Sequence, residues 1–319
     1  MIRIHEFNAE SSRVLSGGTS VTIGKFDGVH RGHQLLLAEA RSSALAYTVR
    51  HPGHPARTCA FTFIEKDARI PEHSRIQTAE ERAQSIQEAG ADILVEYPFG
   101  REEMNMEPGD FVREILLDRL HMKALTVGTD FRFGHERRGT PALLARMAPD
   151  MGFTLKVIPK VRYQGEEISS TRIRECLEQG RMEDARQMMG HPYSVTSAVL
   201  HGKELGRTLD FPTLNLAAPA EKILPPFGVY FCRVKIGDRW YDSVANLGVQ
   251  PTVAEHHLWL ECNVLDFSGE VYGQTVTAQL LSFERPERKF SGVEELKSTV
   301  MNDRANAEKY FSDKNSAVC

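Results

Sequence analysis

The sequence has few of the features that are typical of secreted proteins, of proteins with a structural metal site, or of membrane-spanning proteins. Its 319 residues include only five cysteines, an odd number, and no two of them form a C-x-x-C pair. A disulfide framework or a structural zinc site is therefore not expected, and reduced thiols in a cytoplasm are the simpler interpretation. No apolar run reaches the length of a membrane span. The first residues also lack the apolar core of a secretory signal. We therefore expect a cytoplasmic protein with no membrane partner.

A dominant charge of one sign is also absent. The chain has 39 Lys and Arg against 43 Asp and Glu, which gives a net charge of −4 with the two signs well mixed. A general nucleic-acid binder would carry a basic footprint, so no nucleic-acid partner is expected. At 41% hydrophobic and 26% charged residues, the chain has the composition of a soluble globular protein long enough for two domains. Any binding of phosphates must therefore be local.

Short apolar strands alternate with helical segments in the first half. The predicted strands are 21–24, 59–63, 92–97, 124–128 and 153–158, and the predicted helices are 33–47, 78–89, 108–120 and 141–147. Thr78 and Glu81 could form a capping box at the start of the second helix, which Gly90 would end. This alternation predicts an α/β domain with a doubly wound parallel sheet, whose ligand site lies at the carboxyl ends of the strands.

The pattern changes near residue 191, after two short helices over 170–180 and 182–190. The strands predicted beyond this point are 193–200, 228–236, 240–248, 258–267 and 274–283, and a helix is predicted over 293–311. In GVYFCRVKI, apolar positions alternate as in a half-buried antiparallel strand, and Gly237-Asp238 then signals a hairpin turn. We predict a small antiparallel β-barrel with a C-terminal helix. The predicted domains are residues 1–186 and 187–319.

The first candidate site is GKFDGVHRGH (24–33), which joins the strand VTIG to an apolar helix. Gly24, Gly28 and Gly32 allow a tight turn that brings backbone N–H groups close to a ligand, and a helix N-terminus beside them favours a polyphosphate. His30 and His33 could both donate to phosphate oxygens. By itself, H-x-G-H fits loop glycines and a helix-capping histidine at least as well as a phosphate site. Its position after the first strand favours the phosphate site.

Two further segments of the first half carry candidate binding residues. ISSTRIR (168–174) begins a helix, where Ser170, Thr171 and Arg174 suit the charge that builds on a leaving pyrophosphate. An S-S-T before a helix is otherwise an ordinary N-cap. VGTDFRFG (127–134) follows a strand. There Asp130 could contact a sugar hydroxyl or a flavin ring, and Phe131 and Phe133 could line an aromatic ligand site or belong to the core.

HGKELGRTLDFPTLNL (201–216) is the candidate site of the second half. Thr213 and Asn215 stand two apart in a strand, so their side chains share a face, and two oxygen ligands suit Mg²⁺. The preceding glycines and basic residues could form a flap over ATP phosphates. The alternative is a solvated turn whose Thr and Asn bond to their own backbone. Glu261 lies in the largely apolar strand LWLECNVL, where an inward-facing carboxylate without a function would be costly. An outward-facing strand Glu is the alternative.

These motifs, in this order, resemble the family of bacterial bifunctional riboflavin kinase/FAD synthetases. GKFDGVHRGH, VGTDFRFG and ISSTRIR are similar to its adenylyltransferase half, and GKELGRTLDFPTLN, GVYFCRV, VANLGVQPTV and ECNVLDFSGEVYG to its kinase half. The resemblance implies that the second half phosphorylates riboflavin to FMN with ATP, and that the first adenylylates FMN to FAD and releases pyrophosphate. Mg²⁺ is the implied cofactor, ATP the co-substrate, and flavoproteins are candidate acceptors of the products.

The resemblance also implies a role for particular residues. The residues with implied catalytic roles are Glu261 as general base, His30, His33 and Arg174. The residues with implied ATP contacts are Gly24, Phe26, Asp27, Gly28, Ser170, Thr171, Gly202, Lys203, Gly206 and Arg207. Thr213 and Asn215 would hold the metal, while Asp130, Phe131 and Arg285 would border the flavin. A general base suits the kinase step, because the 5′-hydroxyl of riboflavin is neutral, whereas an FMN phosphate is already an anionic nucleophile.

Several residues depart from the family pattern. Lys25 stands where the family usually has Asn, and IEKDAR (64–69) replaces a turn that usually bears proline and histidine. Asp210 and Ser197 each replace a usual glycine, and the charge of Asp210 near ATP phosphates predicts a raised KM for ATP. These departures leave two alternatives open: a riboflavin kinase with a weakened or lost adenylyltransferase, or a non-catalytic flavin or nucleotide sensor. The candidate base Glu261 argues against a sensor.

Overall fold

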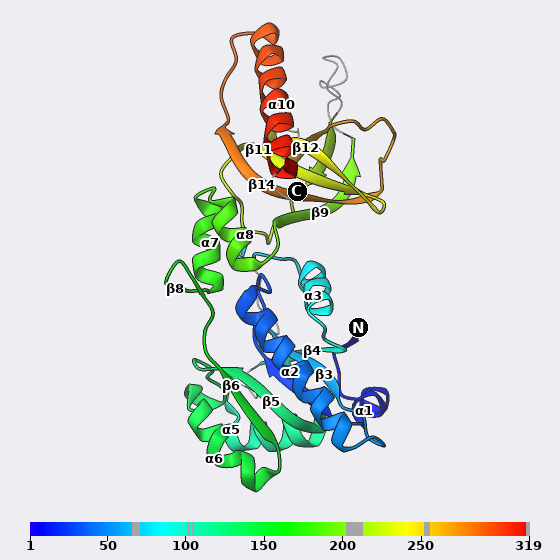
Figure 1. Cartoon of the computed structure of the whole chain (residues 1–319), viewed down its shortest axis with the longest axis vertical. Helices are drawn as coiled ribbons and strands as arrows, with labels where there is room; N and C mark the ends of the chain where they lie inside the picture. The colour runs from blue at the N-terminus through cyan, green and yellow to red at the C-terminus, as the bar shows by residue number, and fades with distance from the viewer. Residues whose placement is uncertain (66–70, 101–102, 104, 202–212, 252–255, 317–319) are drawn as a thin grey trace. The chain divides into compact units, whose positions relative to one another are not determined.

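The structure is a computed structural model in which residues 1–65, 71–100, 103, 105–201, 213–251 and 256–316 are described (Figure 1). The chain folds as two compact units. The first unit comprises Met1–Ile70 and Ala79–Ser169, and the second comprises Pro71–Thr78 and Ser170–Cys319. Within the described part of the chain, no helix is both long enough and apolar enough to cross a bilayer.

A six-stranded parallel sheet, in the order β1-β4-β3-β2-β5-β6, forms the centre of the first unit. Its strands are β1 (Ile2–Ile4), β2 (Thr19–Ile23), β3 (Arg57–Glu65), β4 (Ile93–Phe99), β5 (Met122–Gly128) and β6 (Thr154–Ile158). The five predicted strands are all present. The sequence did not predict β1, because three residues are too few to show a periodic pattern.

Helices cover both faces of this sheet. The further elements of the unit are α1 (Ala9–Leu15), α2 (Arg31–Arg50), α3 (Ala79–Glu88), α5 (Pro108–Asp110), the π-helix η1 (Phe111–Arg119), the 3₁₀ turn η2 (His135–Arg137), α6 (Pro141–Met151) and a hairpin of β7 (Arg162–Tyr163) and β8 (Glu166–Glu167). On one face, Leu37 of α2 joins Ala60 of β3 in a buried cluster. On the other, Phe61 of β3 packs in a second cluster with Phe111 of η1. The predicted doubly wound α/β architecture is confirmed.

The strand order reverses between β2 and β5. From β2 the chain continues to β3 and β4 on one side of the sheet, and it later returns to β5 and β6 on the other. Thr22 of β2 pairs with Thr126 of β5, so the carboxyl ends of these two strands are neighbours. In open α/β sheets, ligands bind at such a switch point. The predicted loops 24–33 and 129–134 therefore start from adjacent strand ends.

A closed antiparallel barrel, in the order β10-β13-β12-β11-β14-β9, forms the centre of the second unit. Its strands are β9 (Tyr193–Leu200), β10 (Leu214–Ala217), β11 (Gly228–Ile236), β12 (Arg239–Pro251), β13 (His256–Val264) and β14 (Thr275–Pro286). All five strands predicted here are present, and β10 carries the Asn of the Pro-Thr-x-Asn motif. Gly237, with a φ of 58°, turns the chain between β11 and β12, as its position predicts.

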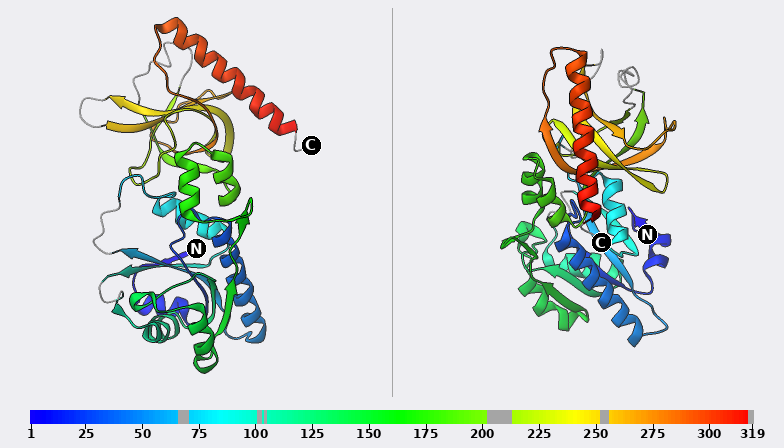
Figure 2. Two further views of the ribbon diagram at one scale, coloured as in Figure 1. Left: turned by 90° about the vertical axis from the view of Figure 1, so that its left-hand side faces the viewer. Right: turned by 45° about the horizontal axis from the view of Figure 1, so that its top comes forward.

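The long helix α10 (Val293–Ser316) runs along the outside of the barrel in every view (Figures 1 and 2). In β11, Tyr230 and Cys232 are fully buried inside the barrel, as the alternation predicts. Phe231 points the other way and is nevertheless only 5% exposed, because Phe311 of α10 packs in one cluster with it. The strand is buried on both faces here, which its own alternating pattern does not reveal.

Helices α7 (Ser170–Glu178) and α8 (Met182–Met189) precede the barrel, and each is followed by a glycine with positive φ. The sequence pattern assigns them mostly to the first half. In the structure α8 packs against β14 and β9, and both helices belong to the second compact unit. Residues 71–78 belong there too, since Ile223 N–H donates to the carbonyl of Arg75 at 2.7 Å. The boundary after residue 186 between two catalytic halves stays a prediction.

Candidate functional site

The loop between β2 and α2 is held in a tight turn. Phe26, Gly28 and Val29 have φ angles of 52°, 81° and 31°, which is uncommon for residues with a side chain. Phe26 and Val29 are buried in the cluster beneath the loop, and the N–H of Gly24 donates to the carbonyl of Phe61 at 3.1 Å. Because the ring of Phe26 is fully buried, any contact of this residue with ATP would come from its backbone. The loop residues next to Phe26 that do reach the surface carry polar side chains.

Two histidines form the start of α2. His30 is the N-cap, and its Nδ1 accepts a hydrogen bond from the backbone N–H of His33 at 3.4 Å. Their rings are stacked with centroids 3.7 Å apart. Burial lowers the pKa of His30 to about 4. Burial, and secondarily the neighbouring His30, hold the pKa of His33 well below its ordinary value. Both rings are therefore neutral at neutral pH.

The charges on this loop come from its other residues. Lys25 and Arg31 are exposed cations, and Asp27 is half-buried in the same turn. Since the histidines are neutral, they can donate hydrogen bonds to an anion but add no positive charge. The loop thus joins neutral donors, a helix N-terminus and two exposed cations at the switch point of the sheet, which is an arrangement suited to a phosphorylated ligand.

Asp130 and Phe131 follow the neighbouring strand β5. The carboxylate of Asp130 is paired with Lys160 Nζ at 3.1 Å. Glu167 and Asp130 together raise the pKa of Lys160. Phe131 is half-buried and stacks on Phe133, with centroids 5.3 Å apart. Phe133 is only 6% exposed and belongs to the core. Of the residues predicted on this segment, Asp130 and Phe131 are thus the ones with accessible surface.

The SST segment begins α7, with Ser170 as its first residue and Thr171 exposed. Arg174, one turn later, donates from Nε to the carbonyl of Ser74 at 3.0 Å and so ties α7 to the segment 71–78. These residues belong to the second compact unit, whereas the two histidines belong to the first. A joint site for ATP made from both groups stays a prediction.

Three polar side chains form a row across the barrel. Asn215 of β10 pairs with Glu261 of β13, which pairs with Asn246 of β12. The next row, which fills the barrel interior, is Leu216, Leu260 and Leu247, all 0–1% exposed. Because side chains alternate along a strand and directly opposed residues share a face, the polar row points to the outside of the barrel. Glu261 thus faces outward, and the argument from an inward-facing carboxylate does not hold.

Glu261 is distinguished by the polar side chains beside it rather than by its burial. It is half-buried between the amides of Asn215, which is 6% exposed, and Asn246. Thr213 stands two residues before Asn215, immediately ahead of β10. Sequence reasoning missed Asn246, although an Asn within the apolar strand VANLG was a signal that could have found it. No group of three or more His, Cys, Asp or Glu side chains in the described ranges could hold a metal ion.

Arg285 has a structural partner. Its Nε and Nη2 donate to the carboxylate of Asp303 on α10 at 2.9 and 2.6 Å, and its Nη1 donates to the carbonyl of Pro286 at 3.2 Å. Asp303 is 3% exposed and raises the pKa of Arg285. These contacts hold α10 against the end of β14. The flavin contact expected for Arg285 stays a prediction.

The remaining predicted residues fall on segments without a description. Gly202, Lys203, Gly206, Arg207 and the atypical Asp210 all lie outside the described residues, as does most of the atypical segment 64–69. The other departure in the second half, Ser197, is half-buried in β9 and pairs with Val276.

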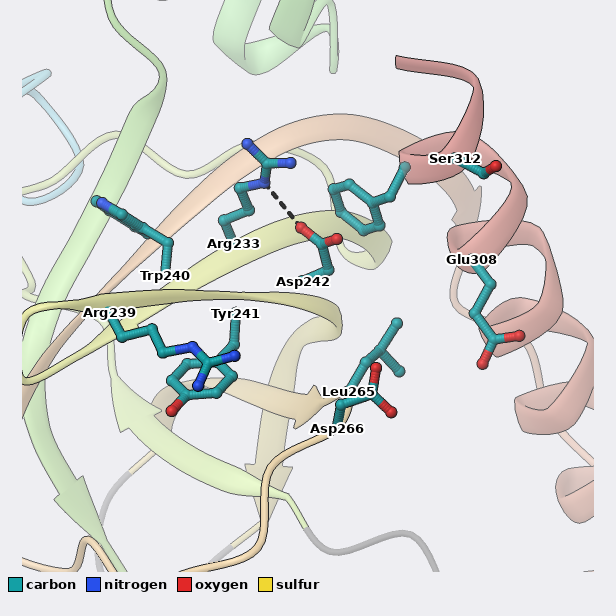
Figure 3. Close-up of a pocket in the computed structure, with 10 residues that line it drawn as sticks. Arg233, Arg239, Trp240, Tyr241, Asp242, Leu265, Asp266, Glu308 and Ser312 are labelled. Carbon is teal, nitrogen blue, oxygen red and sulfur yellow. Dashed lines mark hydrogen bonds and ion pairs between the residues drawn. The ribbon is translucent and has the colours of Figure 1, made fainter. Parts of the chain in front are cut away.

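A pocket of about 890 Å³ opens on the outer face of the barrel, between the β11–β12 hairpin, the residues after β13 and the last turns of α10 (Figure 3). Arg233 donates to Asp242 at 2.8 Å and lies over the ring of Phe311, which joins the hairpin to the helix. Asp242 and Asn246 share a face of β12 four residues apart, or roughly 13 Å. The pocket therefore lies away from the polar row, and no residue predicted from the sequence lines it.

Family models match both halves of the chain. Residues 13–172 match the model described as FAD synthetase, and residues 189–311 match the model described as riboflavin kinase. The first match ends within α7, and the second begins at the last residue of α8. The two matches thus cover the parallel sheet except β1, with its β2–α2 loop, and the barrel with its polar row.

Individual proteins match over nearly the whole length. The bifunctional riboflavin kinase/FMN adenylyltransferase of Escherichia coli K12 is 33% identical over 92% of this chain and 93% of its own length. The protein of the same name from Bacillus subtilis 168 is 31% identical over 92% of both. A crystal structure named as a macrolide-efflux protein from Streptococcus pneumoniae is 27% identical, with a TM-score of 0.83 over 97% of this chain and 99% of that one.

Proposed function

Because the chain belongs to the bifunctional riboflavin kinase/FMN adenylyltransferase family, we propose that it makes FAD from riboflavin in two steps. Its C-terminal half, residues 187–319, transfers the γ-phosphoryl group of ATP to riboflavin and forms FMN. Its N-terminal half, residues 1–186, transfers the adenylyl group of a second ATP to FMN and releases pyrophosphate. The observation that most supports the kinase step is the pairing of Glu261 with Asn215 on the outer face of the barrel.

In the kinase half, Glu261 is the general base. The 5′-hydroxyl of riboflavin must lose a proton as its oxygen attacks the γ-phosphorus, and a carboxylate can accept it. Asn215 and Asn246, on the two neighbouring strands, flank Glu261 on the same face of the barrel. Phosphoryl transfer depends mainly on alignment, so a base set on a closed barrel rather than on a loop suits the step.

The oxygen atoms of Thr213 and Asn215 fit Mg²⁺. This ion takes few protein ligands and keeps waters and nucleotide phosphates in its remaining positions, so a hydroxyl and an amide oxygen next to the base are sufficient. When bound, it would neutralise charge on the phosphates of ATP. Asn215 is 6% exposed, so its amide is already ordered. Gly202, Lys203, Gly206 and Arg207 would cover the phosphates.

In the adenylyltransferase half, no strong base is needed, because the attacking FMN phosphate is already an anion. His30 and His33 are neutral donors to the phosphates of ATP, beside the N-terminus of α2 and Gly24, Phe26, Asp27 and Gly28. Ser170, Thr171 and Arg174 would hold the departing pyrophosphate. Asp130 and Phe131, which follow the neighbouring strand, would border the flavin, as Arg285 would in the kinase half.

The expected partners are small molecules: flavins and ATP, with flavoproteins as acceptors of FMN and FAD. We expect the protein in the cytoplasm.

A product assay tests the function. The purified protein is incubated with ATP and Mg²⁺ and either riboflavin or FMN, and the flavins formed are separated by chromatography. FAD from both substrates supports the two-step enzyme. FMN from riboflavin, with no FAD from either substrate, would contradict the first half of the proposal and favour a kinase with a lost adenylyltransferase, for which Lys25 and segment 64–69 give a reason. Binding without turnover of any substrate would indicate a sensor.

A further inference from the structure

The polar row on the outside of the barrel continues beyond the proposed base. Asn246 lies directly opposite Glu261 on β12, and the next residue across the sheet, Val229 of β11, is apolar and buried. On this side of Glu261, the row therefore offers one further polar side chain, that of Asn246, before it meets the buried Val229. A substrate that extends from Glu261 in this direction would meet the amide of Asn246.

A second carboxylate lies over the same face of β12. Asn246 Nδ2 donates to Oε1 of Glu287 at 3.3 Å. Gly248, two residues from Asn246 on the same face, makes room for it, because a Cβ at Gly248 would collide with the Glu287 carboxylate. Glu287 itself follows β14 and is exposed. The glycine thus leaves space for the exposed carboxylate on this strand face, and a Cβ at this position would displace the flexible Glu287 side chain from it.

The spacing of these groups matches a short polyol. Adjacent strands lie about 4.8 Å apart, so Asn246 is one such step from Glu261. In the ribityl chain of riboflavin, the 5′-carbon and the 2′-carbon are three C–C bonds apart, or about 4 Å in an extended chain at about 1.5 Å per bond. If the 5′-hydroxyl lies at Glu261, the secondary hydroxyls reach the level of Asn246 and Glu287. Both side chains present acceptor oxygens, and hydroxyl groups donate.

We propose that Asn246 and Glu287 bind the secondary hydroxyls of the ribityl chain and so select flavins that carry a polyol. This inference rests on the proposed role of Glu261 as the base that receives the 5′-hydroxyl. Glu287 accepts from a hydroxyl while Asn246 fixes its position, and Asn246 accepts through Oδ1. Gly248 leaves the space in which Glu287 accepts from Asn246, so a side chain at this position would move the carboxylate away.

The preference should be measurable but moderate. A hydrogen bond to a charged acceptor contributes a factor of about 10–100 in affinity. Sites that bury the acceptor completely discriminate by about 10⁴ or more. Because Glu287 is exposed, it stays hydrated when no hydroxyl is present, so we expect the smaller factor.

The test compares riboflavin with an analogue of the same ring whose side chain is 5-hydroxypentyl, which keeps the terminal hydroxyl and lacks the secondary ones. Both are assayed with ATP and Mg²⁺ for phosphorylation by the wild-type protein, Asn246→Ala, Glu287→Ala and Gly248→Ala. The matched control is Glu294→Ala, an exposed carboxylate in the first turn of α10. Binding of each flavin without ATP is measured by fluorescence quenching.

We expect the wild-type protein to prefer riboflavin about 10–100-fold in kcat/KM. Glu287→Ala and Gly248→Ala should remove most of this preference by lowering the value for riboflavin alone, with KM for ATP unchanged. An equal loss for both flavins would overturn the inference, because it would mean that these residues support Glu261 or the fold. No loss for either flavin would also overturn it. Absence of riboflavin phosphorylation by the wild-type protein would instead refute the kinase assignment, and the binding data would still decide the hydroxyl contact.

Discussion

The ion pair between Arg285 and Asp303 is a contact whose removal should clearly weaken the second unit. It joins the end of β14 to α10 through two hydrogen bonds of 2.9 and 2.6 Å, in the two-pronged geometry that makes Arg–carboxylate pairs strong. The side chains are 23% and 5% exposed. Asp303→Asn would keep the shape of the buried side chain, remove its charge, and leave the guanidinium with only the weaker attraction of Glu284.

Breaking a buried ion pair from one side costs about 3–5 kcal/mol, because the remaining charge is left uncompensated. Water reaches part of Arg285, so the cost here should be lower, about 2–3 kcal/mol. For a domain of this size, the dependence of the free energy of unfolding on urea is about 2 kcal/mol per M. The unfolding midpoint of the second unit should therefore fall by about 1 M urea.

The chain itself supplies a probe that separates the two units. It has two tryptophans, Trp240 and Trp259, and both lie in the barrel, one 40% and the other 9% exposed. Tryptophan fluorescence thus follows unfolding of the second unit only. FAD formation from FMN in the same samples reports on the proposed function of the first half, and it should be unchanged in the absence of urea.

The matched control is the pair of Arg304 with Glu308 on the same helix, at 3.1 Å with side chains 38% and 58% exposed. An exposed pair of this kind is worth about 0.5 kcal/mol or less, so Glu308→Gln should shift the midpoint by no more than about 0.3 M. A double-mutant cycle with Arg285→Ala and Asp303→Ala isolates the pair. If Asp303→Asn shifts the fluorescence transition no more than Glu308→Gln, the reasoning from burial is refuted.

Three further predictions concern the two proposed sites. Glu261→Gln should abolish FMN formation from riboflavin and leave FMN-to-FAD conversion intact in the product assay; loss of both activities would contradict independent sites. Burial lowers the pKa of His30 from 6.5 to about 4, so between these pH values His30 is protonated in the unfolded chain but not in the folded one. The first unit should therefore lose up to about 3 kcal/mol of stability as pH falls from 6.5 to 4, and none of this loss should occur above pH 6.5. Urea unfolding followed by circular dichroism should show a shallower loss for His30→Asn, and equal slopes would refute the burial argument. Gly28→Ala, at a φ of 81°, should cost about 1 kcal/mol and slow FAD formation but not FMN formation. Gly53→Ala, with open space around it, is the control and should change neither rate.

Local patterns in the sequence were sufficient to predict most elements of both units. Strands such as β9 and β11 match their predicted bounds because alternation and flanking turn residues depend on neighbours along the chain. The position of His30 at the start of α2 was equally predictable, since capping is a local contact. The family resemblance rests on the same local motifs, and the comparisons confirm it.

Contacts between segments distant in sequence were decided by the tertiary structure. Loops 24–33 and 129–134 come together because β2 and β5 are neighbours in the sheet, and no local pattern encodes strand order. Burial of Phe231 depends on α10, which follows it by some sixty residues, and residues 71–78 join the second unit through backbone hydrogen bonds to residues 220–223.

The proposed kinase site shows the same division. The sequence alone indicated Asn215 and Glu261 as separate candidates, each with an ordinary alternative. Closure of the barrel set the register that places them opposite each other and aligns Asn246 beside them. A shift of one residue in either strand would turn one side chain into the interior. The chemistry of each residue was therefore determined by the sequence, and their common face was determined by strand pairing, because register is set by the packing of the whole barrel.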